Sequence, residues 1–311
     1  MALPHEQNED QTQAQRRFGV VAVLGAPNAG KSTLTNQLVG TKVSIVSPKV
    51  QTTRARISGI FCHSESQILL LDTPGIFVNH KRRLEKAMVK SAWSSAEDAD
   101  SCVLVIDASA RKIGEDARSI LDRLAQTKMP CLLVLNKVDM VKPEKLFALT
   151  EEITAVREFD KVFMVSALNG DGVADLKNEI SANAPVGPWH FPEDQLSDLP
   201  ERMLAAEVVR EKLFLNLHQE LPYNLTVETE SYKETKKGIR IEQVIYVTRV
   251  QHKAMVLGKN GQKVKQVCMA ARKDLADIYG VDVHLFLFVK VRENWLDDPE
   301  RYREMGLNFE K

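Results

Sequence analysis

The chain has 311 residues, and its 44% hydrophobic and 27% charged content is that of an ordinary folded protein, which excludes bulk disorder and predicts two domains with cores. Its 42 basic residues balance 42 acidic ones, so any affinity for nucleic acid or an anionic membrane must come from local clusters of charge. No stretch approaches the roughly 20 apolar residues of a membrane span, and the four cysteines lack the paired spacings of zinc sites, which is typical of reduced packing residues in a cytosolic protein.

Residues 1–17 are polar and lack the apolar core of a signal peptide, so we expect a disordered tail there. Residues 18–183 alternate short β-rich runs with helical patterns. The runs are apolar on both faces, as buried parallel strands are, and they cover 18–25, 68–72, 102–107, 131–136 and 161–167. This alternation predicts an α/β domain with a doubly wound, mostly parallel sheet.

A glycine-bracketed loop, "GAPNAGKS", follows the first strand and precedes a helix predicted at 32–40. Its glycines let backbone N–H groups approach phosphates, while Lys31 can reach the β and γ oxygens and Ser32 can ligate magnesium. An ordinary strand-to-helix turn is the alternative, but the flanking strand and helix favour a phosphate site. The predicted nucleotide-binding residues of this loop are Gly25, Ala26, Pro27, Asn28, Ala29, Gly30, Lys31, Ser32 and Thr33.

The polar segment 40–56 is of the kind that folds only when a γ-phosphate and magnesium are there to hold it. We select Thr53 as the magnesium-ligating threonine, with the adjacent Thr52 as a weaker candidate. A passive loop is the alternative. The segment is therefore predicted to be the first of two switches that respond to GTP.

The motif "LLLDTPG" ends a second buried strand and opens the second predicted switch, 73–84. Asp72 is placed to hold magnesium through a water molecule, and the Gly75 N–H could sense a γ-phosphate. Thr73 and Pro74 complete the predicted contacts of this motif. By itself the motif could be only a turn, so its value depends on the other motifs around it.

The residue after this motif is Ile76, and a hydrophobic side chain cannot orient the attacking water. We therefore assign no side-chain base and expect slow intrinsic hydrolysis. The predicted catalytic residues are Lys31, Thr53 and Gly75.

The motif "VLNKVD" ends a further buried strand, and there Asp139 can accept two hydrogen bonds from the ring N–H and the amine of guanine. Adenine has no matching donor pair, so ATP would leave this carboxylate unpaired. Asn136 and Lys137 would brace the loop, and Ser166, Ala167 and Leu168 would close over the base. All these elements follow strand ends, where ligands bind in open α/β sheets, and together they predict a guanine-nucleotide site.

Residues 184–200 contain four prolines, which disfavour a continuous helix or strand and indicate a linker. A second domain is predicted over 201–293. It contains a helix at 201–221, two strands at 223–234 and 238–249, a helical pair around residues 256–264, and a final strand at 281–291. The resulting order is α, β, β, α, α, β.

The loop "GKNG" has the G-x-x-G spacing with which KH domains clamp about four nucleotides of single-stranded RNA. The pattern is weak alone, but residues 249–273 carry seven Lys or Arg and no acidic residue. A solvated helix face is the alternative, although acids should then be interspersed. The predicted RNA-binding residues are Val256, Leu257, Gly258, Lys259, Asn260, Gly261, Lys263, Lys265 and Arg272.

From residue 18 to the end, the chain resembles the Era GTPases through "GAPNAGKS", "QTTR", "DTPGI", "NKVD" and "SAL". "LPYNLTVE", "GKNGQKVK" and "VHLFLFVKVRENW" resemble the type II KH domain of that family. The resemblance implies a P-loop GTPase domain followed by an α+β KH domain, with magnesium as cofactor and potassium bound through Asn28. It also implies binding to the 3′ end of small-subunit ribosomal RNA and a role in assembling the small ribosomal subunit. We expect a cytoplasmic monomer that exchanges GTP and GDP, with peripheral contact at the inner face of the cell membrane as a further expectation.

Two other functions fit parts of the sequence. A signalling or membrane-associated GTPase could dock a protein through residues 81–98, although protein docking does not require the acid-free basic segment. A nucleotide-independent RNA-binding module is disfavoured because no phosphate, magnesium or base position is missing. The tail 294–311 could pack on the KH domain or cover its RNA groove, and the sequence does not decide between them.

Overall fold

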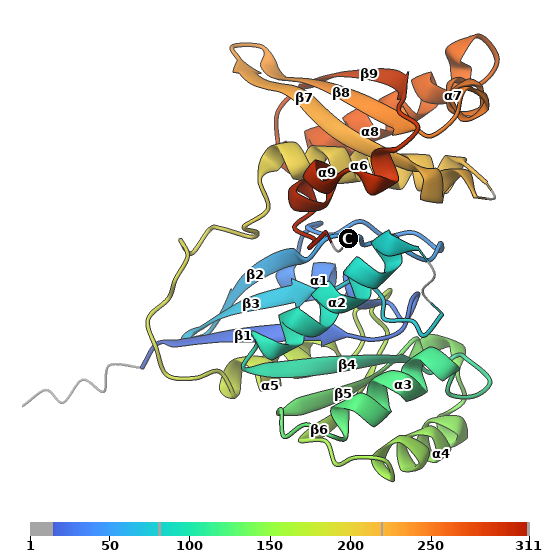
Figure 1. The fold of residues 1–311 in the computed structure, drawn as a ribbon. Helices are drawn as coiled ribbons and strands as arrows, with labels where there is room; N and C mark the ends of the chain where they lie inside the picture. The colour runs from blue at the N-terminus through green and yellow to red at the C-terminus, as the bar shows by residue number, and fades with distance from the viewer. Residues whose placement is uncertain (1–14, 80–81, 219, 310–311) are drawn as a thin grey trace, which may run out of the picture.

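The computed structural model describes residues 15–79, 82–218 and 220–309, which form two domains joined by an extended segment (Figure 1). The expected tail at 1–17 lies outside the described residues, apart from 15–17. In the described part of the first domain, the strands form one sheet in the order β2-β3-β1-β4-β5-β6, and only β2 runs antiparallel to its neighbour. The strands are β1 (Arg17–Leu24), β2 (Ile57–His63), β3 (Ser66–Asp72), β4 (Ser101–Asp107), β5 (Cys131–Asn136) and β6 (Lys161–Val165).

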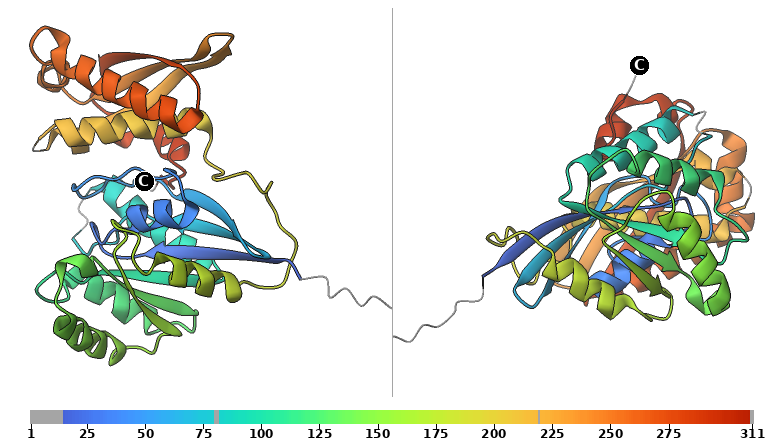
Figure 2. Two further views of the ribbon diagram at one scale, coloured as in Figure 1. Left: turned by 180° about the vertical axis from the view of Figure 1, so that it is seen from behind. Right: turned by 90° about the horizontal axis from the view of Figure 1, so that it is seen from below.

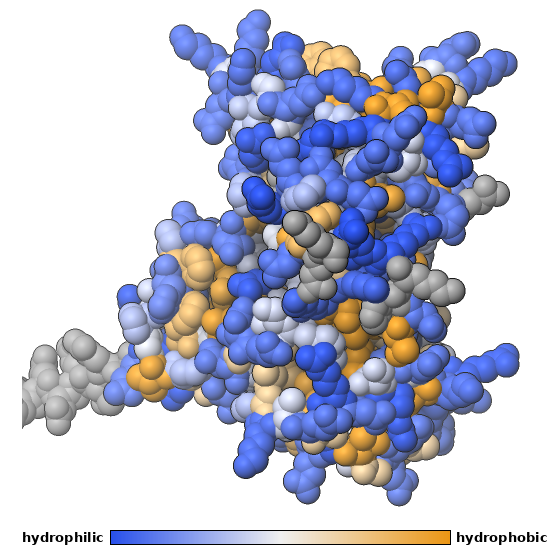
Figure 3. Space-filling model, viewed as in Figure 1, coloured by the Kyte–Doolittle hydropathy of each residue, from blue (hydrophilic) through white to orange (hydrophobic). Residues whose placement is uncertain are grey.

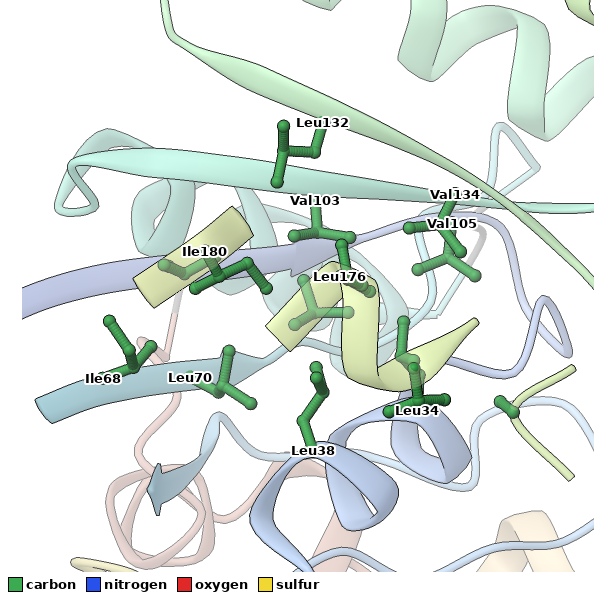
Figure 4. Close-up of a cluster of buried hydrophobic side chains, with 14 of the residues drawn as sticks. Leu34, Leu38, Ile68, Leu70, Val103, Val105, Leu132, Val134, Leu176 and Ile180 are labelled. Carbon is green, nitrogen blue, oxygen red and sulfur yellow. The ribbon is translucent and has the colours of Figure 1, made fainter. Parts of the chain in front are cut away.

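Helices cover both faces of this sheet, as the doubly wound prediction requires. One face packs against α1 (Lys31–Val39) and α5 (Val173–Ala182), whose leucines and isoleucine meet the β-strand side chains in a continuous core (Figure 4). The other face packs against α2 (Arg83–Glu97), α3 (Glu115–Leu124) and α4 (Pro143–Thr154). Burial on both faces explains why the central strands are apolar throughout.

Strand β2 was not predicted, because its sequence contains a glycine and follows a polar loop. It pairs antiparallel with β3 along its whole length through a turn at Ser64, whose φ is 51°. Gly59 is what lets α1 approach: a Cβ there would lie 2.7 Å from Cγ2 of Val39. A glycine inside a strand thus marks a close helix contact here and not a strand end.

The predicted linker contains no helix or strand, but it contacts the first domain. It runs along the edge of β2, where the Ile60 N–H donates to the Leu196 carbonyl at 2.8 Å and the Ser197 hydroxyl donates to the Ser58 carbonyl at 2.6 Å. Figure 2 shows this segment passing beside the sheet before it reaches the second domain. Its backbone covers an otherwise open sheet edge.

The second domain has the predicted order of α6 (Glu201–Asn216), β7 (Leu225–Thr235), β8 (Gly238–Val247), α7 (Val250–Leu257), α8 (Gln262–Tyr279) and β9 (Val283–Val291). Strands β7 and β8 pair antiparallel, and β8 and β9 pair parallel. The helices pack against one face of this sheet around a second core. Parallel pairing of β8 with β9, after a helical pair, is the α+β KH arrangement that was predicted.

The C-terminal tail lies between the two domains. It forms a short turn, η4 (Trp295–Asp297), and α9 (Pro299–Glu304), and Trp295 is fully buried. Tyr302 and Leu307 pack on the apolar face of α2. The tail therefore packs on the KH domain, one of the two expected positions, and on the GTPase domain as well.

Most hydrophobic side chains of the described residues are buried or partly buried in these cores. The face in Figure 3 is mainly hydrophilic, with hydrophobic residues in separate patches. Among the helices of the described residues, none combines the length and the apolar character that crossing a membrane would need.

Candidate functional site

The loop between β1 and α1 requires glycine at both ends of the motif. Gly30 has φ 98°, and a Cβ on it would lie 2.1 Å from Nδ2 of Asn136. A Cβ on Gly25 would lie 2.5 Å from the carbonyl oxygen of Val105. Any side chain at either position would push the loop away from β4 or β5. The backbone is thus held close to the strand ends, where a phosphate would sit.

Lys31 begins α1 and is buried under this loop. Its ammonium donates to the carbonyls of Gly25 and Ala26 at 3.1 and 3.0 Å. Burial lowers the pKa of Lys31 from 10.5 to about 8, and the nearby Asp72 carboxylate opposes that shift. The loop therefore holds the lysine where phosphate oxygens would replace the carbonyls as its partners.

Nucleotide affinity is expected to fall as the pH rises above about 8, because the free protein then loses the Lys31 proton. Bound phosphates stabilise the ammonium, so the complex has the higher pKa and binding takes up a proton. Calorimetry of GDP binding near about pH 9, in two buffers of different ionisation enthalpy, measures this uptake. The Lys31→Arg variant stays charged and should take up fewer protons than the wild type; equal uptake by both proteins would contradict the assignment.

The predicted magnesium ligands converge beside Lys31. The hydroxyl oxygens of Ser32 and Thr53 are 2.9 Å apart, which is about the separation of neighbouring oxygens around a magnesium ion with ligands at about 2.0–2.1 Å. Asp72 is fully buried, and its Oδ1 atom has no hydrogen-bond partner among the described residues. Thr52 instead contacts the Ser47 hydroxyl and the carbonyl of Lys49. These residues fit a magnesium ion, and they favour Thr53 over Thr52.

Two residues that the sequence analysis missed organise this part of the site. Ser44 donates to the Asp72 Oδ2 atom at 2.6 Å, and Asn36 accepts from the N–H groups of Val43 and Ser44 at 2.9 Å each. Burial raises the pKa of Asp72, while hydrogen bonds from Ser44 and Ser32 and the charge of Lys31 act against that rise. No local pattern singles out a serine or an asparagine for such long-range contacts.

The second switch begins with a tight contact to the phosphate loop. A Cβ on Gly75 would lie 2.9 Å from Cα of Pro27, so only glycine fits there. Thr73 donates to the Val23 carbonyl at 2.7 Å, which fixes the strand end. Ile76 is 4% exposed and packs into the core beneath α2. Its side chain is therefore occupied by packing in this core.

Asn136 connects three of the predicted motifs. Its amide donates to the Ala29 carbonyl at 2.8 Å and accepts from the Ala167 N–H at 2.9 Å. Lys137 pairs with Asp107 at 2.6 Å, and Asp107 was missed although it too ends a buried strand. Asp139 lies exposed on the short turn η1 (Val138–Met140), and Leu168 is also exposed. Asn136 and Lys137 thus hold the loop in place, while the predicted base-recognition residues Asp139 and Leu168 remain exposed to solvent.

One cleft gathers the predicted phosphate and magnesium residues. It lies between the loop after β1 and the first switch, and its lining includes Asn28, Lys31, Ser32, Thr33, Thr53 and Gly75. Asn28 has φ 62°, a conformation that asparagine tolerates better than most residues. These predicted phosphate and magnesium residues thus share one cleft.

The G-x-x-G loop is a sharp turn between α7 and α8. Gly258 and Gly261 have φ of 70° and 72°, and Asn260 between them has φ 52°. A Cβ on Gly258 would also lie 2.7 Å from Cβ of Lys263. Three residues in the left-handed region make a turn that glycine and asparagine tolerate best, and its tip projects from the domain (Figure 1).

The basic residues of this loop are accessible. Lys259, Lys265 and Arg272 are exposed, and Lys263 is partly exposed. Val256 needs correction as an RNA contact, because its side chain is fully buried in the KH core, while Leu257 is only partly buried. Helical periodicity could have placed Val256 inside, because it stands on the face of α7 that meets the sheet.

Family models match both halves of the chain. Residues 20–137 match the model described as a 50S ribosome-binding GTPase, and residues 220–296 match the KH domain model. GTPase Era of Brucella suis biovar 1 (strain 1330) is 56% identical over 296 residues, with 95% of this chain and 94% of that protein covered. GTPase Era of Sinorhizobium medicae (strain WSM419) is 54% identical over 312 residues, with both chains fully covered.

Two solved structures resemble the whole molecule. A crystal structure of Era with MgGDPNP and nucleotides 1506–1542 of 16S ribosomal RNA has a TM-score of 0.88 at 38% identity, covering 94% of this chain and 99% of that one. A variant of Aquifex aeolicus Era bound to GDP and AlF4− has a TM-score of 0.87 at 38% identity, covering 93% and 99%.

Proposed function

This chain belongs to the Era family of GTPases, and we propose that it couples its GTP cycle to binding of the 3′ end of small-subunit ribosomal RNA during assembly of the small ribosomal subunit. The GTPase activity itself follows from membership of this family. RNA binding by this chain is supported by the G-x-x-G turn, which lies inside a basic segment without acidic residues. The turn follows α7 directly. The solved Era structure with a 16S RNA fragment supports the choice of RNA.

The chemistry assigned to this chain is positioning and charge stabilisation. Lys31 would hold the β and γ oxygens, and the N–H of Gly75 would contact the γ-phosphate. Ser32 and Thr53 would ligate magnesium directly and Asp72 through water; the ion, when bound, neutralises developing phosphate charge. Because Ile76 cannot orient the attacking water, hydrolysis without a partner should be slow.

Asn28 is proposed to help hold a potassium ion beside the phosphates, where the positive charge would take the place of an arginine finger. Its position in the phosphate cleft supports this role. Equal turnover in potassium and sodium chloride would remove the potassium site.

We propose that the protein is a cytoplasmic monomer. Any contact with the inner face of the membrane would be peripheral, since no helix of the described residues could span it. Flotation with anionic vesicles would decide that contact, because protein that stays with the aqueous fraction at low salt has no such affinity.

Protein docking through residues 81–98 is the weaker alternative. The apolar face of α2, with Leu84, Ala87 and Met88, is already covered by Tyr302 and Leu307 of the tail. Residue 81 lies outside the described residues. A docking partner would therefore have to displace part of the same chain.

The test is binding of a fluorescent single-stranded RNA that copies the 3′ end of small-subunit ribosomal RNA. We expect the affinity with a non-hydrolysable GTP analogue to differ from that with GDP by about fivefold or more, a typical coupling between two sites. An RNA of scrambled sequence is the control. Equal affinities in both nucleotide states would leave RNA binding intact but reject the coupling.

A further inference from the structure

Two neighbouring residues of the first switch point in opposite directions. Thr53 lies against Ser32 in the nucleotide cleft, whereas Arg54 enters the KH domain and is 2% exposed. Its guanidinium donates to the Leu225 carbonyl at 2.7 Å and to the Pro222 carbonyl at 3.1 Å. A single peptide bond therefore joins Thr53, the predicted magnesium ligand, to Arg54, which anchors the switch to the KH domain.

The hydrogen bonds and ring contacts of this anchor form a cage and come from the KH domain and the tail. The Arg54 guanidinium lies 5.6 Å from the ring centre of Phe214 and 5.8 Å from that of Trp295. Both rings are fully buried. Aromatic faces attract a cation most when water is excluded, and the two carbonyls supply directional acceptors. Because the guanidinium is a rigid planar fork, this cage fixes its position closely.

Helix α6 makes several further contacts with the rest of the switch. The Arg210 guanidinium donates to the Thr52 carbonyl, and the Glu211 carboxylate accepts from the Val46 N–H at 2.9 Å. Lys49 donates to the carbonyl of Phe214. The views from opposite sides in Figures 1 and 2 both show α6 next to the first switch. One turn of this KH helix thus contacts the switch on the N-terminal side of Thr53, and the contacts of Arg54 hold it on the C-terminal side.

The arrangement that is held is the one suited to magnesium. With their oxygens 2.9 Å apart, Ser32 and Thr53 can both reach one ion without moving. Contacts that stabilise this arrangement must raise affinity for the nucleotide state that uses Thr53, by thermodynamic linkage. GDP, which lacks the γ-phosphate, gains less from an ordered first switch.

We propose that Arg54 is a positioning residue through which the KH domain holds Thr53 in its magnesium-ligating place and so favours GTP over GDP. This inference rests on the proposed GTP switch and names the contact that regulates it. The residue acts through Thr53 and touches neither the nucleotide nor the RNA.

The experiment compares full-length Arg54→Ala with Arg56→Ala. Arg56 is a matched control: it has the same side chain two residues later, is 39% exposed and pairs with Asp98 of its own domain at 3.5 Å. Affinities for a non-hydrolysable GTP analogue and for GDP are measured by fluorescent-nucleotide titration across magnesium concentrations, without RNA. We expect Arg54→Ala to weaken analogue binding about tenfold and to require more magnesium. GDP binding should change less than about twofold.

Arg54→Ala leaves two carbonyls unpaired, so its fold is checked by circular dichroism. If it does not fold, Arg54→Lys decides alone: one hydrogen bond and no planar stacking should give an intermediate loss of analogue affinity. An unchanged ratio of analogue to GDP affinity, or the same loss in Arg56→Ala, overturns the proposal. Because no RNA is present, these outcomes are independent of whether RNA binding by the wild type depends on the nucleotide.

Discussion

Replacing Asp139 with asparagine is expected to lower GTP affinity by at least about a hundredfold and to create affinity for xanthosine triphosphate. The carboxylate is predicted to accept from two donors of guanine, and asparagine would present its own N–H group to one of them. Xanthine carries a carbonyl in place of that amine, so the amide then finds an acceptor. Competition titrations with both nucleotides measure the exchange of specificity.

The exposure of Asp139 makes this a test of recognition and not of folding. Its turn is held by Asn136 and Lys137, whose contacts the substitution leaves in place. Asp122→Asn, on the exposed face of α3, is the matched control and should bind GTP as the wild type does. If Asp139→Asn keeps its affinity for GTP, the base site has been misplaced.

The double substitution Lys259→Asp with Asn260→Asp is expected to reduce affinity for the single-stranded RNA at least about a hundredfold at low salt. The change reverses one positive charge and adds a second negative one at the tip that would meet the phosphates. Asn260 has a positive φ, and aspartate tolerates that conformation nearly as well, so the turn should persist. Fluorescence anisotropy with the RNA 3′-end fragment measures the loss.

A control that also places two aspartates in a turn, with a slightly larger change in net charge, lies at the far end of the KH sheet. Lys236 and Lys237 are exposed in the turn between β7 and β8, away from α7 (Figure 1). Lys236→Asp with Lys237→Asp should weaken RNA binding only through the general change in charge, by about tenfold or less. A similar loss in both double variants would mean that net charge, and not the G-x-x-G turn, governs the affinity.

Local signals determined most of what could be predicted about this protein. The strand, loop and helix around Lys31 are contiguous in sequence, and the nucleotide motifs each follow a buried strand. Because parallel strands end at a common edge, their motifs meet without any further information. The α, β, β, α, α, β order of the KH domain follows equally from periodicity and turn residues.

Tertiary structure decided what depends on contacts between distant segments. Strand β2 pairs with the edge of β3, and its Gly59 leaves room for α1 to pack against it. The contact with Ser32 favours Thr53 over Thr52, and the apolar face of α2 gives the tail its place. Arg54 reads from sequence as one more charge in a polar loop, yet its cage combines Phe214 with Trp295, which are far apart along the chain. Sequence patterns report local propensity and periodicity, whereas such contacts depend on which surfaces the finished fold brings together.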